Sequence, residues 1–235
     1  FFLAELFFAY YNRAHKEKQY FSAIKILKKG IPIEHITHQK EFMKLNFFVD
    51  KNVLIPRQDT EILVEEVIKI AQKTNAKKIL DLCTGSGAIA VSLAKYLPQS
   101  EITAIDISND ALKIAKKNAV SNNVENQITF ISSDMFTNLN EEKFDIIVSN
   151  PPYIPETEVV DPLVKDNEPN VALFGGNDGL KFFHIILENA PKIMKEKCIL
   201  AFEHGYNKTQ EIEAICKKYF PDANIYTKKE YKVFS

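Results

Sequence analysis

Residues 78–90, KILDLCTGSGAIA, are the stretch that decides the fold. The apolar run Lys78–Leu82 predicts a short buried strand, and Ala88–Tyr96 has the spacing of a helix. Between them, Gly85 and Gly87 let the backbone turn sharply and approach a ligand closely, next to the free N–H groups of a helix N-terminus. This order of strand, glycine-rich turn and helix is typical of the ligand-binding turn of a parallel α/β sheet.

The same alternation of strands and helices continues along the chain. We expect further strands at Ile102–Asp106, Ile128–Ile131, Phe144–Ser149, Ile199–Glu203 and Asn224–Tyr226. We expect helices at Glu61–Lys73, with Asp59 or Thr60 as its N-cap, and at Asp110–Asn118, Phe182–Ile193 and Thr209–Tyr219. Such alternation predicts an α/β fold, with a Rossmann-like, mostly parallel sheet and helices on both of its faces.

The first 40 residues have a different character. Apolar and aromatic residues alternate there with Lys and Glu, without a strand-like run, and this pattern predicts helices. Gly30-Ile31-Pro32 interrupts the segment, and a new apolar pattern begins at Phe42. We therefore divide the chain into a small N-terminal helical segment, residues 1–40, and one α/β domain, residues 41–235.

Composition limits the kinds of partner that we expect. The 235 residues include 30 basic and 31 acidic side chains, for a net charge of -1, whereas nucleic-acid binders more often have a strong basic excess. Cys83, Cys198 and Cys216 lack the spacing of metal ligands, so we expect no metal, reduced thiols and a cytoplasmic protein. No apolar stretch approaches the roughly 18–20 residues that a membrane span needs.

The glycine-rich turn and an acid on the next strand indicate a nucleotide-like cofactor. Asp106 follows Gly87 by nineteen residues, close to the roughly 20 expected for an acid that binds ribose hydroxyls. The turn is not a Walker phosphate loop, because no Gly-Lys-Ser/Thr follows. NAD would fit the glycine spacing, but the charge of Asp81 would repel a pyrophosphate and suits the ammonium group of S-adenosylmethionine.

The expected cofactor contacts come from three strand ends and from Asn150. They are Asp81, Cys83, Thr84, Gly85, Ser86, Gly87, Asp106, Asp134, Met135 and Asn150, with Asp134 and Met135 placed to meet an adenine ring. Two of these acids have an alternative, structural role. Asp81 could bond the N–H groups of the loop, and Asp106 could cap the next helix, although Ser108 suits that position better.

The expected strand Phe144–Ser149 ends at a tetrapeptide, Asn150-Pro151-Pro152-Tyr153. Two successive prolines remove two N–H donors, so the carbonyls of Asn150 and Pro151 need partners outside a sheet ladder. With the Asn150 amide oxygen and the flat ring of Tyr153, they suit a planar –NH2 group. A plain strand-terminating turn is the alternative, but the aperiodic stretch Pro155–Asn177 that follows is long enough to indicate a functional loop.

With the glycine loop, Asp106 and the tetrapeptide in this order, the chain resembles class I methyltransferases that methylate planar amino groups. Among them it is most similar to the PrmC/HemK family, which methylates the glutamine side chain of peptide-chain release factors. Three segments carry this closer resemblance, which extends from about residue 30 to residue 206. They are residues 47–61, ending in Pro56-Arg57-Gln58-Asp59-Thr60-Glu61, residues 168–180, beginning with Glu168-Pro169-Asn170, and Glu203-His204-Gly205-Tyr206.

The resemblance implies a protein-(glutamine-N5) methyltransferase of translation termination. It implies S-adenosyl-L-methionine as cofactor, S-adenosyl-L-homocysteine as product and release factors as protein partners. Asn150, Pro151, Pro152 and Tyr153 would be the catalytic residues, and residues 1–40 would dock the substrate, although this segment is shorter than the family's N-terminal domain. Cys83, where Gly is frequent, and His204, where an apolar residue is common, depart from the family pattern.

Two other functions stay open at this point. Asn-Pro-Pro-Tyr can also hold a flipped base, so the chain could methylate an exocyclic amino group of DNA or RNA, although it lacks a basic target-recognition region. It could also be a non-catalytic protein that keeps S-adenosylmethionine as a structural ligand.

Overall fold

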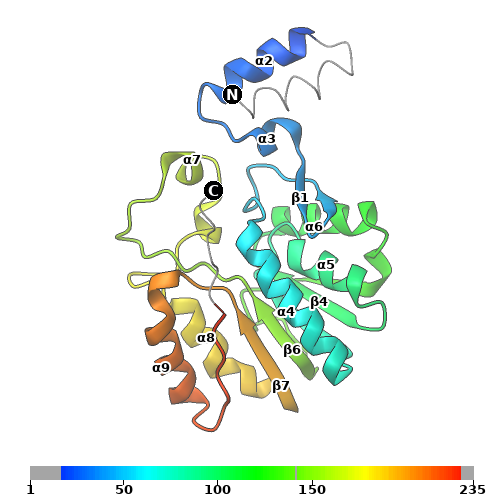
Figure 1. Ribbon diagram of the computed structural model, residues 1–235, viewed down its shortest axis with the longest axis vertical. Coiled ribbons are helices and arrows are strands. Elements are labelled where there is room, and N and C mark those ends of the chain that lie inside the picture. Colours follow the sequence, from blue (N-terminus) through cyan, green and yellow to red (C-terminus); the bar gives the residue numbers. More distant parts are fainter. Residues whose placement is uncertain (1–16, 141, 229–235) are drawn as a thin grey trace.

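Five parallel strands form the central sheet, in the order β5-β4-β3-β6-β7 (Figure 1). Their bounds are β3 Lys78–Leu82, β4 Glu101–Asp106, β5 Ile128–Ser132, β6 Phe144–Ser149 and β7 Met194–Phe202. The predicted parallel α/β sheet is confirmed. The chain passes from β3 outward through β4 to β5 and then crosses back to β6, so its direction of winding reverses between β3 and β6.

This computed structural model describes residues 17–140 and 142–228, with side chains from residue 21 onward. The first sixteen residues of the expected N-terminal segment and residues 229–235 lie outside the described part.

Helices cover both faces of the sheet (Figure 1). Alternate strand residues point to opposite faces, so Ile79 and Ile146 are buried against α4 and α5, while Leu80 and Ile147 are buried against α8. The helices are α4 Gln58–Thr74, α5 Ala88–Tyr96 and α6 Asn109–Ser121 on one side, and α8 Lys181–Asn189 and α9 Thr209–Tyr219 on the other. Because both faces are packed, the strand sequences read as continuous apolar runs.

The chain before the sheet forms helices and a hairpin. The helices α2 Glu17–Leu27 and α3 Ile33–Thr37 lie beyond the carboxyl edge of the sheet, and the strands β1 Lys40–Phe42 and β2 Leu45–Phe47 pair antiparallel (Figure 1). Gly30, between α2 and α3, accepts a hydrogen bond at its carbonyl from Asn167 Nδ2 at 2.8 Å. The N-terminal segment is therefore tied to the loop that follows the tetrapeptide.

Short helical turns make up much of the remaining structure. They are η1 Glu125–Gln127, α7 Pro162–Lys165, η2 Asn170–Ala172, η3 Ala190–Lys192 and η4 Tyr206–Lys208. Within residues 17–140 and 142–228, no helix combines the length and apolar character needed to cross a membrane.

Two local predictions are wrong. Helix α4 begins at Gln58, its N-cap is Arg57, and no side chain caps it, so neither Asp59 nor Thr60 is the cap. Residues Asn224–Tyr226 are not a strand, because the chain there follows α9 without joining the sheet.

Candidate active site

The site is built at the carboxyl edge of the sheet, where the five strands end together. In parallel register, Leu82 lies beside Ile105 on one side and Ser149 on the other, and Ser149 lies beside Phe202. The glycine loop after β3 and the tetrapeptide after β6 are therefore neighbours at the point where the winding reverses. Open α/β sheets bind ligands at this kind of position.

Backbone conformation explains the small residues of the glycine loop. Gly87 has φ +80, and a Cβ atom there would lie 3.0 Å from the Ala115 Cβ, so a side chain would crowd α6. Gly85 has φ +55 and nothing within 4 Å of the position of a Cβ, which leaves its outer face open. Cys83 has φ 61, a left-handed conformation that favours glycine.

Hydrogen bonds fasten this loop to the neighbouring strand and helix. Thr84 donates from its backbone N to the Ile105 carbonyl at 2.9 Å. The Ser86 carbonyl accepts from Asn118 Nδ2 at 2.8 Å, and the same amide group reaches the Phe48 carbonyl at 3.0 Å. The loop is thereby joined to α6 and, through Asn118, to the segment at residue 48.

Asp81 lies under the loop with 0% of its surface exposed. Its Oδ2 accepts from Thr84 Oγ1 at 2.6 Å and from the Ala90 backbone N at 3.1 Å, whereas Oδ1 is buried and has no partner among the described residues. Burial raises the pKa of this carboxyl from 3.8 to about 7. One oxygen thus has the structural role considered from the sequence, and a cofactor ammonium would have to interact with the other.

The Asp106 carboxylate accepts hydrogen bonds from the backbone of the glycine loop and from the start of α6. Oδ2 accepts from the Gly85 N at 2.8 Å and Oδ1 from the Ser108 N at 2.9 Å. An ionised carboxylate has about four acceptor positions, so this leaves capacity for ribose hydroxyls. Burial raises the pKa of Asp106 despite these bonds. Ser108 is the N-cap of α6 and accepts from the Ala111 N at 3.2 Å, which confirms the preference for Ser108 as the cap.

The residues expected to meet the adenine lie at the end of β5. Asp134 is exposed, and Met135 is buried with its Sδ 3.8 Å from the Cys83 Sγ. Burial also raises the pKa of the Cys83 thiol, so this cysteine is an apolar neighbour of Met135, not a reactive thiolate. The structure therefore brings the ends of β3 and β5 together beside Asp106.

Burial and side-chain hydrogen bonds hold the tetrapeptide in place. Pro151 and Pro152 are buried, and the Asn150 Nδ2 donates to the Thr60 Oγ1 at 3.2 Å. The Tyr153 hydroxyl donates to Glu203 Oε1 at 3.3 Å, and burial raises the pKa of this phenol. Because Asn150 turns its amide nitrogen toward Thr60, its Oδ1 points to the opposite side.

A loop covers the backbone of the tetrapeptide. The Gly175 N donates to the Ile154 carbonyl at 2.9 Å, and a Cβ atom on Gly175 would lie 2.5 Å from the Pro152 carbonyl oxygen. A Cβ atom on Gly179, which has φ +78, would overlap the Tyr153 carbonyl oxygen. Only glycine permits this close contact at both positions.

Thr60 and Glu203 belong to the candidate site, although no functional role was predicted for either from the sequence. Thr60 was expected to be a helix cap, yet it is buried and donates to Glu203 Oε2 at 2.5 Å. Burial raises the pKa of Glu203, and the hydroxyls of Thr60 and Tyr153 act in the opposite direction. Both residues lie in segments that carry the family resemblance, and this could have marked them as candidates. Neither segment, however, reveals that the two side chains contact each other.

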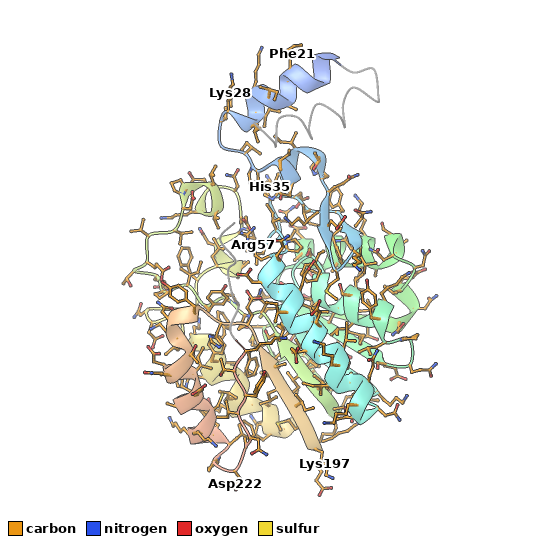
Figure 2. The ribbon with its side chains drawn as sticks, viewed as in Figure 1. Phe21, Lys28, His35, Arg57, Lys197 and Asp222 are labelled. Atoms are coloured by element: carbon orange, nitrogen blue, oxygen red, sulfur yellow. The ribbon has the colours of Figure 1, made fainter. Side chains whose placement is uncertain are left out.

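The third resembling segment, residues 168–180, also contacts the first, residues 47–61. Arg57, at the start of α4 (Figure 2), forms an ion pair between its Nη2 and Glu168 Oε1 at 2.5 Å. The second oxygen of the buried Glu168 accepts from the Ile55 N at 2.9 Å. This pair joins the chain before α4 to the loop that covers the tetrapeptide. His204 places its Nδ1 2.9 Å from the Gly205 carbonyl oxygen.

The residues at this edge fit S-adenosylmethionine. They offer a carboxylate with spare acceptor capacity at Asp106, an open glycine at Gly85, a buried thioether at Met135 and an unpartnered carboxylate oxygen at Asp81. In the part of the chain that the structure describes, no group of three or more His, Cys, Asp or Glu residues could hold a metal ion.

Known proteins are similar to this chain in sequence and in fold. The Methyltransferase small domain family matches residues 57–168. A release factor glutamine methyltransferase of Clostridium acetobutylicum is 46% identical over 202 residues, covering 84% of this chain and 71% of that protein. One of Clostridium botulinum is 39% identical over 215 residues, covering 89% and 76%.

A solved structure, SMU.776 complexed with SAH, has a TM-score of 0.55 and 15% identity, and covers 77% of this chain and 46% of that chain. At this identity the likeness concerns the fold alone. The sequence identity to the two clostridial proteins, over most of both lengths, is the stronger finding. The chain belongs to the release factor glutamine methyltransferase family.

Proposed function

We propose that this protein transfers a methyl group to the side-chain amide nitrogen of the glutamine in the Gly-Gly-Gln motif of peptide-chain release factors. The methyl donor would be S-adenosyl-L-methionine and the product S-adenosyl-L-homocysteine. The observation that carries the proposal is the position of the tetrapeptide, fixed at the end of β6 directly beside the glycine loop, in a chain of this family.

Asp106 and the open face of Gly85 would hold the cofactor beside Met135. Asp81 Oδ1, which is buried and has no partner among the described residues, is the oxygen that would face its ammonium group. S-Adenosylmethionine, when bound, supplies a methyl group that its sulfonium has already activated. The protein's own task is then to orient the nucleophile and to accommodate the charge that develops on it.

A glutamine amide nitrogen is a poor nucleophile, because its lone pair is delocalised into the carbonyl. We assign to Asn150 Oδ1 and to the Pro151 carbonyl the acceptance of one amide hydrogen each. Two fixed acceptors would aim the nitrogen and stabilise its growing positive charge, each by about 3–4 kcal/mol if they resemble oxyanion-hole donors. The ring of Tyr153 would lie on the flat amide, and the prolines would keep the carbonyls in place.

No strong general base is required in this scheme, because a methylated amide that carries a positive charge loses its proton readily. Residues 1–40 would help to dock the protein substrate, since α2 and α3 lie beyond the same edge of the sheet as the tetrapeptide (Figure 1). We place the reaction in the cytoplasm, where translation takes place.

The test is transfer of a labelled methyl group by the full chain. Three substrates are compared: a release factor, the same factor with its Gly-Gly-Gln glutamine replaced by asparagine, and DNA or RNA. The proposal expects label on the unmodified release factor alone. Label on nucleic acid would instead identify a base N-methyltransferase, and cofactor binding without any transfer would identify a binding protein.

A further inference from the structure

A chain of hydrogen bonds connects Asn150 to the half-buried carboxylate of Glu203. Asn150 Nδ2 lies 3.2 Å from Thr60 Oγ1, and Thr60 Oγ1 lies 2.5 Å from Glu203 Oε2. The other carboxylate oxygen of Glu203 receives the Tyr153 hydroxyl at 3.3 Å. Thr60 is 3% exposed, so water has little access to replace these partners.

The chain has a fixed direction, which follows from what each group can donate. In its ionised form the Glu203 carboxylate only accepts. The hydroxyls of Thr60 and Tyr153 approach its two oxygens, so Thr60 donates its single hydroxyl hydrogen to Glu203. The Thr60 oxygen can then only accept from its remaining neighbour. The asparagine amide is nearly symmetric in shape. Thr60, together with the Glu203 carboxylate, which the Asn150 amide also approaches, therefore selects the orientation in which the –NH2 group faces inward.

We propose that Thr60 and Glu203 are positioning residues that set the orientation of the Asn150 amide. They leave its Oδ1 turned outward as an acceptor for the substrate –NH2 group. This inference rests on the proposed function, in which Oδ1 accepts an amide hydrogen of glutamine. With the opposite orientation, Asn150 would present two hydrogens to a substrate group that also carries hydrogens, and the nitrogen would be repelled from its reactive position.

The same carboxylate also fixes the second half of the site. Glu203 follows β7, and its backbone N donates to the Ser149 carbonyl at 3.1 Å, so its side chain is anchored beside the end of β6. Tyr153 donates to it from the other side. The half-buried Glu203 thus contacts, directly or through Thr60, both the acceptor and the ring expected to contact the substrate amide.

The experiment compares Thr60→Val, which keeps the shape but removes the hydroxyl, with Thr60→Ser, which keeps the hydroxyl. We expect Thr60→Val to lower kcat about tenfold or more, with cofactor Kd changed by less than about twofold, because the lost preference concerns only the nucleophile. Thr60→Ser should retain most of the activity. Thr74→Val, at the exposed far end of the same helix, is the matched control and should behave as wild type.

The decisive arm is the double variant. If Thr60 acts only through Asn150, then Thr60→Val added to Asn150→Ala should lower kcat by less than about a further twofold. Wild-type kcat in Thr60→Val, or independent multiplication of the two effects, would overturn the inference. Full activity of Asn150→Ala itself would instead refute the proposed function.

A second variant protects the test against misfolding. Glu203→Gln places an amide –NH2 group against one of the two hydroxyls and should also lower kcat. If thermal unfolding shows that Thr60→Val does not fold, a folded Glu203→Gln variant with wild-type kcat would overturn the inference in its place.

Discussion

Asp106 is the residue on which cofactor binding depends most directly in this account. Replacing it with Ala removes the acceptors expected for the ribose hydroxyls and should weaken cofactor binding by about 1.5–3 kcal/mol, typical of hydrogen bonds to a charged group. Calorimetric titration of S-adenosylmethionine measures this change. Asp110→Ala is the control, because Asp110 is exposed in the first turn of α6 and pairs only with the exposed Lys113.

Asp106 also holds the Gly85 and Ser108 N–H groups, so part of any loss could come from the loop. Thermal unfolding of the variant separates the two contributions. Unchanged cofactor affinity in a normally folded Asp106→Ala protein would remove Asp106 from the cofactor site.

Asp81 predicts a dependence of stability on pH. Its pKa is raised from 3.8 to about 7, so between these values the folded chain holds a proton that the unfolded chain has released. The free energy of unfolding should therefore fall as pH rises from about 4 to about 7 through this group. Asp81→Asn has no carboxyl group to titrate. The difference between its free energy of unfolding and that of wild type should therefore shift in favour of the variant as pH rises from about 4 to about 7.

The measurement is Tm against pH for both proteins. Asn keeps one oxygen to accept from Thr84 and Ala90, so the variant is the closest uncharged replacement. Parallel Tm curves for the two proteins across that window would show that Asp81 is ionised throughout.

At the scale of elements, the loop at residues 175–179 supports the tetrapeptide. In Gly179→Ala the new Cβ would overlap the Tyr153 carbonyl oxygen. The alanine would also have to adopt the φ of +78 that Gly179 has. Tyr153 and its neighbours must then shift, and we expect kcat to fall at least tenfold, since small displacements at a reacting centre can cost about a hundredfold.

Gly176→Ala is the matched control for this prediction. It has a similar φ of +86, but its Cβ would meet only the Lys181 side chain, at 3.2 Å. The two variants therefore share the conformational strain and differ in contact with the tetrapeptide. Equal kcat values in folded Gly176→Ala and Gly179→Ala would mean that the loop does not set the geometry of the site.

The regular elements were predictable because their apolar periodicity is strong. The strands Lys78–Leu82 and Phe144–Ser149 and the helices Ala88–Tyr96 and Thr209–Tyr219 have the same bounds in sequence and structure. The hairpin of β1 and β2 was missed because its turn places Met43 and Lys44 at φ 50 and 58, without the Asn or Gly that normally marks such a turn.

The site was predictable only where one segment carries the chemistry. The tetrapeptide and the glycine loop are each continuous in sequence, and parallel strands bring them to one edge. The contact between Thr60 and Glu203 spans 143 positions, and Thr60 alone looks like a helix cap. Pairing over such a distance depends on packing, which no local pattern contains.

For the whole molecule, we predict that the N-terminal segment serves substrate docking. Deleting residues 1–28 spares Gly30 and its bond to Asn167, so the catalytic part keeps this contact. The apparent KM for an intact release factor should rise far more than the KM for a short Gly-Gly-Gln peptide. The reason is that only the intact protein is large enough to contact the N-terminal segment beyond the carboxyl edge of the sheet. Equal changes in both KM values would show that the segment serves only stability.

The most direct test of the central claim is mass spectrometry of a release factor after incubation with the full chain and S-adenosylmethionine. We expect one added methyl group, located by fragmentation on the side-chain nitrogen of the Gly-Gly-Gln glutamine. With Asn150→Ala, the rate of modification should fall about a hundredfold or more, while cofactor affinity changes little. A methyl group on another residue, or wild-type modification by Asn150→Ala, would contradict the central claim.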